Sequence, residues 1–150
     1  MKIRRSTPQD ALPISLMEEK YFSDPWCEKD VFSYICSEGG LAYTALTDSD
    51  EVIGYVIGRV IPPEGEIYRI AVSEEHRERG VGYRLLSFAL KSERGRGLET
   101  VFLEVRKKNL PAIRLYTAHG FKECGIRKNY YKDPPDDAVV MIKDRILSDI

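Results

Sequence analysis

A short run of arginine and glycine joins a predicted strand to a predicted helix near the middle of the chain. The run reads Arg77-Glu78-Arg79-Gly80-Val81-Gly82, and it follows an apolar stretch at 66–72 and precedes a helical pattern at 81–92. Glycine lets a ligand approach the backbone closely, and the free N–H groups at a helix start attract anions. The pattern therefore predicts an anion site, to which Arg77 and Arg79 would add positive charge.

Two nucleotide-binding motifs with similar glycine turns do not fit this run. A P-loop requires lysine and then serine or threonine after the second glycine, whereas Tyr83-Arg84 stands here. A dinucleotide-binding fingerprint requires a third glycine at the position of Leu85. A glycine turn that only connects a strand to a helix stays open as an alternative.

Three polar residues further along the chain are also candidates for chemistry. Glu104 lies within the apolar stretch 100–105, on the same face of a strand as Phe102. From the strand alone, a solvated acid at a sheet edge is the more common explanation. Tyr116 has the helical spacing of a packing residue, and Asn109 is expected to cap the start of the same helix.

Aromatic residues and histidines are more ambiguous from their local sequence. Tyr130 and Tyr131 are adjacent in what reads as a polar connection, so packing would use only one of them. Trp26 fits a core anchor and the wall of a binding groove equally well. His76 and His119 have no partner at metal-ligand spacing, and each is expected to cap or end a helix.

The elements that must position these residues follow from hydrophobic spacing and turn signals. Strands are expected at 2–5, 41–46, 52–61, 66–72, 100–105, 121–127 and 138–145, and helices after residue 10, at 28–36, at 81–92 and from 109 to 119. This order predicts an α/β fold with a mixed sheet and helices on its faces, in a single domain over residues 1–150.

Composition narrows the possible classes of protein. The chain has 150 residues and a formal net charge of −1, which gives no general basis for binding nucleic acid or an anionic membrane. The three cysteines are an odd number without CxxC spacing, so we expect free thiols in a reducing compartment and no zinc site. No signal peptide and no run of 18 apolar residues is apparent, and we expect a soluble cytoplasmic protein.

The glycine turn and the second half of the chain resemble the Gcn5-related N-acetyltransferase superfamily. Arg77-x-x-Gly80-x-Gly82 after Ile70-Ala71-Val72 is similar to its acyl-CoA signature, and Leu103-Glu104-Val105-Arg106 follows in the right order. The RimI-type ribosomal-protein-alanine acetyltransferases are the most similar branch, through Asp24-Pro25-Trp26 and Ile126-Arg-Lys-Asn-Tyr-Tyr131. The resemblance covers nearly the full length, and it implies a mostly antiparallel sheet with a splayed central strand pair.

The resemblance implies acetyl-CoA as cosubstrate and no metal. Its diphosphate would lie on the glycine turn and its pantetheine arm along the strand edge. The implied cofactor-binding residues are Ile70, Ala71, Val72, Arg77, Glu78, Arg79, Gly80, Val81, Gly82, Tyr83, Asn109 and Tyr116.

The resemblance also implies Glu104 as general base and Tyr116 as general acid. The amine would be a protein N-terminus, with the alanine of a small-subunit ribosomal protein as the family expectation, and the enzyme a monomer or weak homodimer. The implied substrate-binding residues are Trp26, Tyr68, Tyr130 and Tyr131. Two alternatives stay open, namely a lysine or small-amine acetyltransferase and a non-catalytic acetyl-CoA-binding regulatory module.

Overall fold

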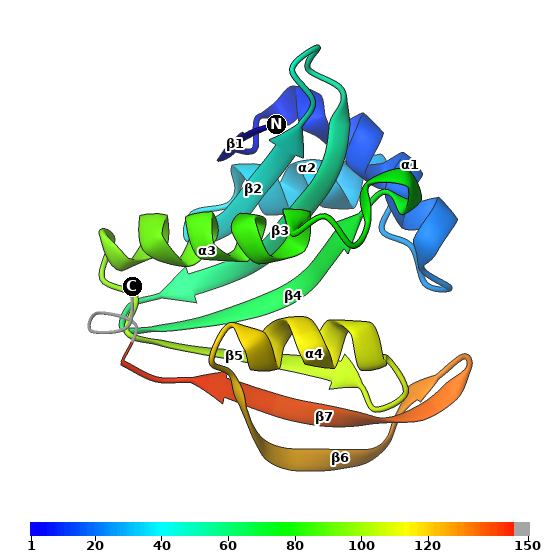
Figure 1. The fold of residues 1–150 in the computed structure, drawn as a ribbon, viewed down its shortest axis with the longest axis vertical. Helices are drawn as coiled ribbons and strands as arrows, with labels where there is room; N and C mark the ends of the chain where they lie inside the picture. Colours follow the sequence, from blue (N-terminus) through cyan, green and yellow to red (C-terminus); the bar gives the residue numbers. More distant parts are fainter. Residues whose placement is uncertain (146–150) are drawn as a thin grey trace.

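One mixed sheet of seven strands organises residues 1–145, the part of the chain that the computed structural model describes (Figure 1). The strand order is β1-β2-β3-β4-β5-β7-β6, and only the central β4–β5 pair is parallel. The strands are β1 (Lys2–Arg5), β2 (Gly40–Leu46), β3 (Val52–Ile61), β4 (Glu64–Val72), β5 (Thr100–Arg106), β6 (Lys122–Lys132) and β7 (Pro135–Lys143). The predicted mixed, mostly antiparallel sheet is confirmed.

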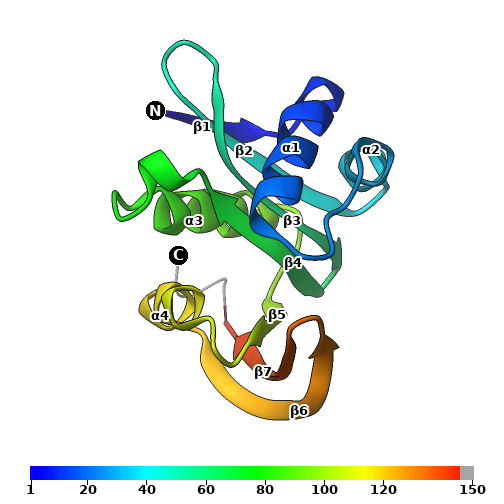
Figure 2. The ribbon, with the colours of Figure 1, turned by 90° about the vertical axis from the view of Figure 1, so that its right-hand side faces the viewer.

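Helices cover both faces of this sheet, as predicted (Figure 2). They are η1 (Pro8–Asp10), α1 (Ala11–Tyr21), α2 (Glu28–Cys36), η2 (Glu74–His76), α3 (Val81–Arg94) and α4 (Leu110–Ala118). The α1–α2 pair lies on one face and the α3–α4 pair on the other.

The apolar pattern of β3 explains how the sheet supports two cores. Val56 packs with Leu85 and Leu86 of α3. Tyr55 and Ile57, on either side of Val56 in the strand, pack with α1 and α2. Alternate residues of a strand point to opposite faces, so a strand that is apolar at every position must be covered on both sides. Burial of these side chains is the main force that holds the helices against the sheet.

The boundaries of three strands differ from the prediction. β4 begins at Glu64, before the predicted 66, and β6 continues to Lys132 instead of ending near 127. β7 then starts at Pro135, so the polar connection predicted between the last two strands shrinks to residues 133 and 134. β6 is an edge strand with mostly exposed side chains, and such a strand tolerates the polar residues that suggested a loop.

Candidate active site

The two central strands separate after a short paired segment. β4 and β5 pair in parallel only as far as Ile67 and Leu103. β4 nevertheless continues beside β3 to Val72, and β5 continues beside β7 to Arg106. The facing edges of the two strands therefore present backbone N–H and C=O groups that do not pair with each other. The predicted splayed pair is confirmed, and the separation between these two strand edges at the centre of the sheet is called the cleft below.

The glycine turn leads directly into α3 at the mouth of this cleft. Gly80 is the residue before the helix and has a φ of +77°, a left-handed conformation that favours glycine. The first helical hydrogen bond runs from the Arg84 N–H to the Gly80 carbonyl, so the N–H groups before Arg84 lie at the positive end of the helix. This backbone geometry suits an anion.

The two glycines of the turn have different surroundings. A Cβ at Gly80 would meet no heavy atom within 4 Å, which leaves room for a ligand. A Cβ at Gly82 would instead lie 3.2 Å from Cδ2 of Leu115 on α4. Glycine at position 82 therefore also allows α3 to pack closely against α4, and its predicted contact with a ligand stays a prediction.

The two arginines of the turn, Arg77 and Arg79, also have different surroundings. The Arg77 Nε donates to the Val72 carbonyl at 2.9 Å, and its guanidinium lies 4.5 Å from the centroid of the Tyr21 ring. Arg77 thus fastens the turn to the end of β4. Arg79 is exposed at the turn, and exposed Tyr83 lies with its ring centroid 4.8 Å from that of His119.

Glu104 occupies the middle of β5 with its carboxylate largely buried. Its side chain is 19% exposed, and Oε1 lies 3.5 Å from Nε of Arg127. Within residues 1–145, Oε2 is buried and has no hydrogen-bond partner. A buried carboxylate oxygen without a donor carries a desolvation cost, so this atom is suited to accept a hydrogen bond or a proton from a bound amine.

A cavity of about 500 Å³ opens beside Glu104. Its polar lining includes Arg59, Glu66, Tyr68 and Arg127. Partial burial and the nearby Glu104 carboxylate raise the pKa of Glu66. The cavity therefore has three carboxylates on neighbouring strands, those of Glu64, Glu66 and Glu104, and room for a small cationic group.

Tyr130 and Tyr131 lie in β6, not in a loop, and both approach the same site. Their rings meet edge to face with centroids 5.1 Å apart, and Arg106 stacks 4.2 Å above the Tyr131 ring. The polar contact of the Tyr130 hydroxyl with Glu104, together with burial, raises the pKa of Tyr130. Burial and the Glu104 charge raise the pKa of Tyr131 to about 12. Both hydroxyls therefore stay protonated at neutral pH.

Tyr116 is buried in α4, where its ring packs 5.7 Å from that of Phe121. Burial raises the pKa of Tyr116, and the neighbouring Tyr131 hydroxyl adds to this effect. Asn109 begins the same helix, and its Oδ1 accepts the Ala112 N–H at 3.3 Å, which confirms the predicted cap. Glu104 therefore interacts electrostatically with Tyr131, and Tyr131 interacts in turn with Tyr116.

The sequence left open whether Trp26 is a core anchor or the wall of a binding groove, and its contacts relate it to both. Its half-buried ring lies 4.5 Å from Tyr34 and 6.5 Å from Tyr68, measured between centroids. Tyr34 and Tyr68 both line a second cavity of about 420 Å³, and Tyr68 is shared with the cavity at Glu104. Trp26 is thus a packing residue directly behind the wall of the site.

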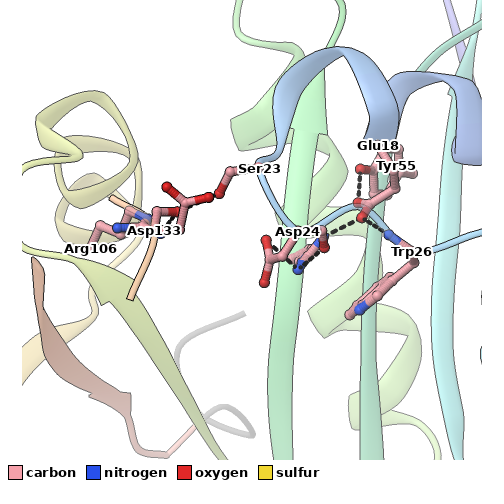
Figure 3. A network of polar contacts seen from close by, with 8 residues as sticks. Glu18, Ser23, Asp24, Trp26, Tyr55, Arg106 and Asp133 are labelled. Carbon is pink, nitrogen blue, oxygen red and sulfur yellow. Dashed lines mark hydrogen bonds and ion pairs between the residues drawn. The ribbon is translucent and has the colours of Figure 1, made fainter. Parts of the chain in front are cut away.

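The loop between α1 and α2 is held by polar residues that the sequence did not reveal (Figure 3). Buried Glu18 accepts hydrogen bonds from the Tyr55 hydroxyl, the Trp26 N–H and Arg69. On the far side of the cleft, the Asp133 carbonyl accepts hydrogen bonds from Ser23 at 2.6 Å and from Arg106 at 3.1 Å. The α1–α2 loop and the β6–β7 turn therefore meet above the cleft.

A β-bulge explains why Tyr68 and Arg69 both face this loop. Arg69 pairs with Ile57 and Ile67 pairs with Gly58, so Tyr68 is an extra residue of β4 opposite β3. An extra residue breaks the alternation of side chains between the two faces and changes the direction in which the neighbouring side chains point. Gly58 of β3 stands at this bulge, where a Cβ would overlap the Glu66 carbonyl oxygen, so a glycine within the predicted strand at 52–61 is its local sequence signal.

The histidines and cysteines do not enter the site. His119 ends α4 as expected, its Nε2 2.8 Å from Ser87 Oγ, and His76 is the last residue of η2. Among residues 1–145, no three His, Cys, Asp or Glu side chains are grouped closely enough to hold a metal ion. The helices of this same segment include none long and apolar enough to cross a membrane.

Comparisons with known proteins agree with this geometry. The sequence model of the acetyltransferase (GNAT) family matches residues 11–121 of the chain. The [ribosomal protein bS18]-alanine N-acetyltransferase of Escherichia coli K12 is 34% identical over 129 residues, covering 83% of this chain and 84% of that protein.

Two solved structures extend the comparison to the fold. The crystal structure of the E. coli ribosomal-protein-S18-alanine N-acetyltransferase aligns with a TM-score of 0.87 and 30% identity, over 96% of this chain and 93% of that chain. The crystal structure of Ard1 from Thermoplasma volcanium also gives 0.87, with 26% identity over 96% and 97% of the two chains.

Proposed function

Because the chain belongs to the acetyltransferase (GNAT) family, it is an N-acetyltransferase, and we propose that its acceptor is the α-amino group of a protein N-terminus. The name of the E. coli relative specifies an alanine of ribosomal protein bS18. We extend this to an N-terminal alanine of a small-subunit ribosomal protein. The observation that carries the proposal is the buried, unpartnered Oε2 of Glu104 beside a cavity, with Tyr130 and Tyr131 near enough for Glu104 to raise their pKa values.

Acetyl-CoA is the proposed donor, on the side of the cleft formed by β4 and α3. The free edge at Ile70, Ala71 and Val72 can pair with the amides of an extended pantetheine arm, as a sheet edge pairs with a peptide. The open space at Gly80 and the start of α3 suit a diphosphate. When bound, this cosubstrate supplies a thioester carbonyl activated for attack.

Glu104 and Tyr116 are the proposed acid–base pair. Glu104 would accept the proton that an ammonium group must lose before its nitrogen can attack, directly or through a water. Burial raises the pKa of Tyr116, so its hydroxyl is protonated at neutral pH and has a proton to give to the departing thiolate. A backbone N–H from Ile70 to Val72 would polarise the carbonyl during direct attack in a ternary complex.

An α-amine suits this arrangement better than a lysine does. An α-amino group with a pKa near 8 is neutral about a tenth of the time at pH 7, whereas a lysine side chain near 10.4 is neutral about once in 2,500. A single carboxylate is a modest base, and it can deprotonate an N-terminal α-ammonium group more readily than a lysine ammonium because the pKa of the α-ammonium group is lower. Hydroxyls of Tyr130 and Tyr131 at the same site would hold the first backbone groups of a peptide.

The experiment that tests the proposal offers two amines in separate peptides. One peptide has a free N-terminal alanine and no lysine, and the other is blocked at its N-terminus and has one internal lysine. Purified enzyme and acetyl-CoA are added, and mass spectrometry measures the gain of one acetyl group. We expect the gain on the first peptide alone.

Other outcomes identify the alternatives. Acetylation of the blocked peptide alone would replace the proposal with a lysine acetyltransferase, and acetylation of a polyamine would indicate a small-amine enzyme. Binding of acetyl-CoA without transfer to any amine would favour the non-catalytic module.

A further inference from the structure

Arg69 makes an unusual set of contacts for a residue beside a cavity. Its side chain is only 12% exposed, and it forms an ion pair with Glu18, which is fully buried. The Arg69 Nη2 also donates to the Asp24 carbonyl at 3.1 Å and lies 3.1 Å from Asp24 Oδ1. A single guanidinium thus joins β4 to α1 and to the segment that follows α1.

Two aromatic rings of that segment enclose the same guanidinium. Its central carbon lies 4.4 Å from the centroid of the Phe22 ring and 4.3 Å from that of the Trp26 ring. A planar guanidinium can stack on aromatic faces while it donates in its own plane, which a lysine ammonium cannot do. Residues 22–26 are therefore arranged around Arg69.

The segment held by Arg69 supports the wall of the amine site. Trp26 packs against Tyr34 and Tyr68, and the Tyr34 and Tyr68 rings lie 5.7 Å apart. Tyr68 faces the cavity at Glu104, and the bulge turns Arg69 toward the same side of the sheet. A displacement of Trp26 would therefore move Tyr68.

We propose that Arg69 is a positioning residue for the acceptor site, which holds residues 22–26 so that Trp26 supports Tyr68 in the wall against which a peptide N-terminus binds. The proposal rests on the function proposed above. Arg69 acts through the loop and not on the reacting atoms. Its loss should weaken peptide binding and leave the acetyl-CoA side of the cleft, at Gly80 and α3, unchanged.

The main test separates positioning from stability with a pair of variants. Arg69→Met leaves the Glu18 carboxylate buried without the cation that it contacts in the structure, so it should destabilise the fold. Arg69→Met with Glu18→Gln removes both charges, and the glutamine oxygen can accept from the Trp26 N–H while its NH2 donates to the Tyr55 hydroxyl oxygen. We expect the double variant to recover most of the lost thermal stability.

Kinetics of the double variant then decide the proposal. We expect the KM for an alanine-starting peptide to rise about tenfold or more, since small misplacements in a binding site cost up to about 100-fold. The KM for acetyl-CoA should stay within about twofold. Recovery of the peptide KM together with stability would overturn the proposal, because the effect would then come from the buried charge alone. Arg69→Lys keeps the positive charge but lacks the planar guanidinium that stacks on the aromatic rings. Its peptide KM should rise less than that of the double variant.

A second readout does not depend on catalysis. Trp26 is the single tryptophan of the chain, so its fluorescence reports on this loop alone. Acrylamide should quench it more strongly in the double variant than in the wild type, and unchanged quenching would contradict the positioning role. If the wild type acetylates no peptide, the proposed function fails, but the quenching experiment still decides whether Arg69 holds the loop.

Discussion

Replacement of Glu104 with glutamine should remove the base and keep the shape of the site. Glutamine has nearly the same size, and the lost ion pair is with Arg127, whose side chain is 60% exposed. Because Arg127 is exposed and Oε2 of Glu104 has no hydrogen bond to lose, the pair should contribute about 0–1 kcal/mol, and the melting temperature should stay within about 3 °C of the wild type. Any large loss of activity in Glu104→Gln would therefore come from chemistry.

The size of that loss should depend on pH in a defined way. A positioned general base contributes roughly 10²- to 10⁴-fold, so kcat/KM at pH 7 should fall by at least about 100-fold. An α-amino group with a pKa near 8 is neutral about a tenth of the time at pH 7 and about nine tenths at pH 9. The variant should therefore regain about tenfold relative to the wild type over this range, because less deprotonation is needed.

The assay is the release of free CoA, measured with a thiol reagent, at several pH values from 7 to 9 with an alanine-starting peptide. Glu66→Gln is the matched control, because it removes a second carboxylate of the same cavity from the neighbouring strand. We expect a loss under about tenfold for this control, without the pH trend. A ratio of wild type to Glu104→Gln that stays constant between pH 7 and 9 would refute the role of Glu104 as a base.

Three further predictions follow from single contacts. Tyr116→Phe keeps the packing against Phe121 and should lower kcat about 100-fold, with the KM for acetyl-CoA within about twofold in steady-state kinetics. Gly82→Ala places a Cβ 3.2 Å from Leu115 and should cost about 1–3 kcal/mol in urea unfolding, whereas an equal stability of both proteins would argue against tight α3–α4 packing there. Burial alone would raise the pKa of Asp10, but hydrogen bonds from Arg4 and the Thr7 N–H lower it overall, so its carboxylate stabilises the fold above pH 4 and this contribution is lost as pH falls further. Asp10→Asn should therefore be less stable than the wild type at pH 7 by about 1–3 kcal/mol, and the difference should shrink in thermal melts at pH 3.

Several features of the site could be predicted from local sequence because they depend on a few consecutive residues. The strand alternation around Glu104 places it opposite Leu103 and Val105, which are buried while Glu104 faces the cavity. The cap at Asn109 follows from its own side chain and the next turn of helix. The glycine turn at Gly80 likewise needs only the backbone freedom of one residue.

Other features depended on which strands pair. Tyr130 and Tyr131 have polar neighbours that suggest a loop, yet both belong to β6, where Tyr131 pairs with Asp136 of β7 and Tyr130 lies in the irregularity just before it. The role of Gly82 is set by Leu115, which belongs to another helix. Neither contact can be read from one segment of sequence.

The sequence by itself determined the order of the elements, the face on which Glu104 lies and the place of the glycine turn, since hydrophobic period and backbone freedom are local properties. The tertiary structure alone decided that Arg69 and Glu18, 51 residues apart, form a buried pair. It also decided that the bulge at Tyr68 turns Arg69 toward the α1–α2 loop. The physical reason is that a buried charge and a strand register are both fixed by partners distant in the chain, whose identity depends on how the whole sheet is assembled.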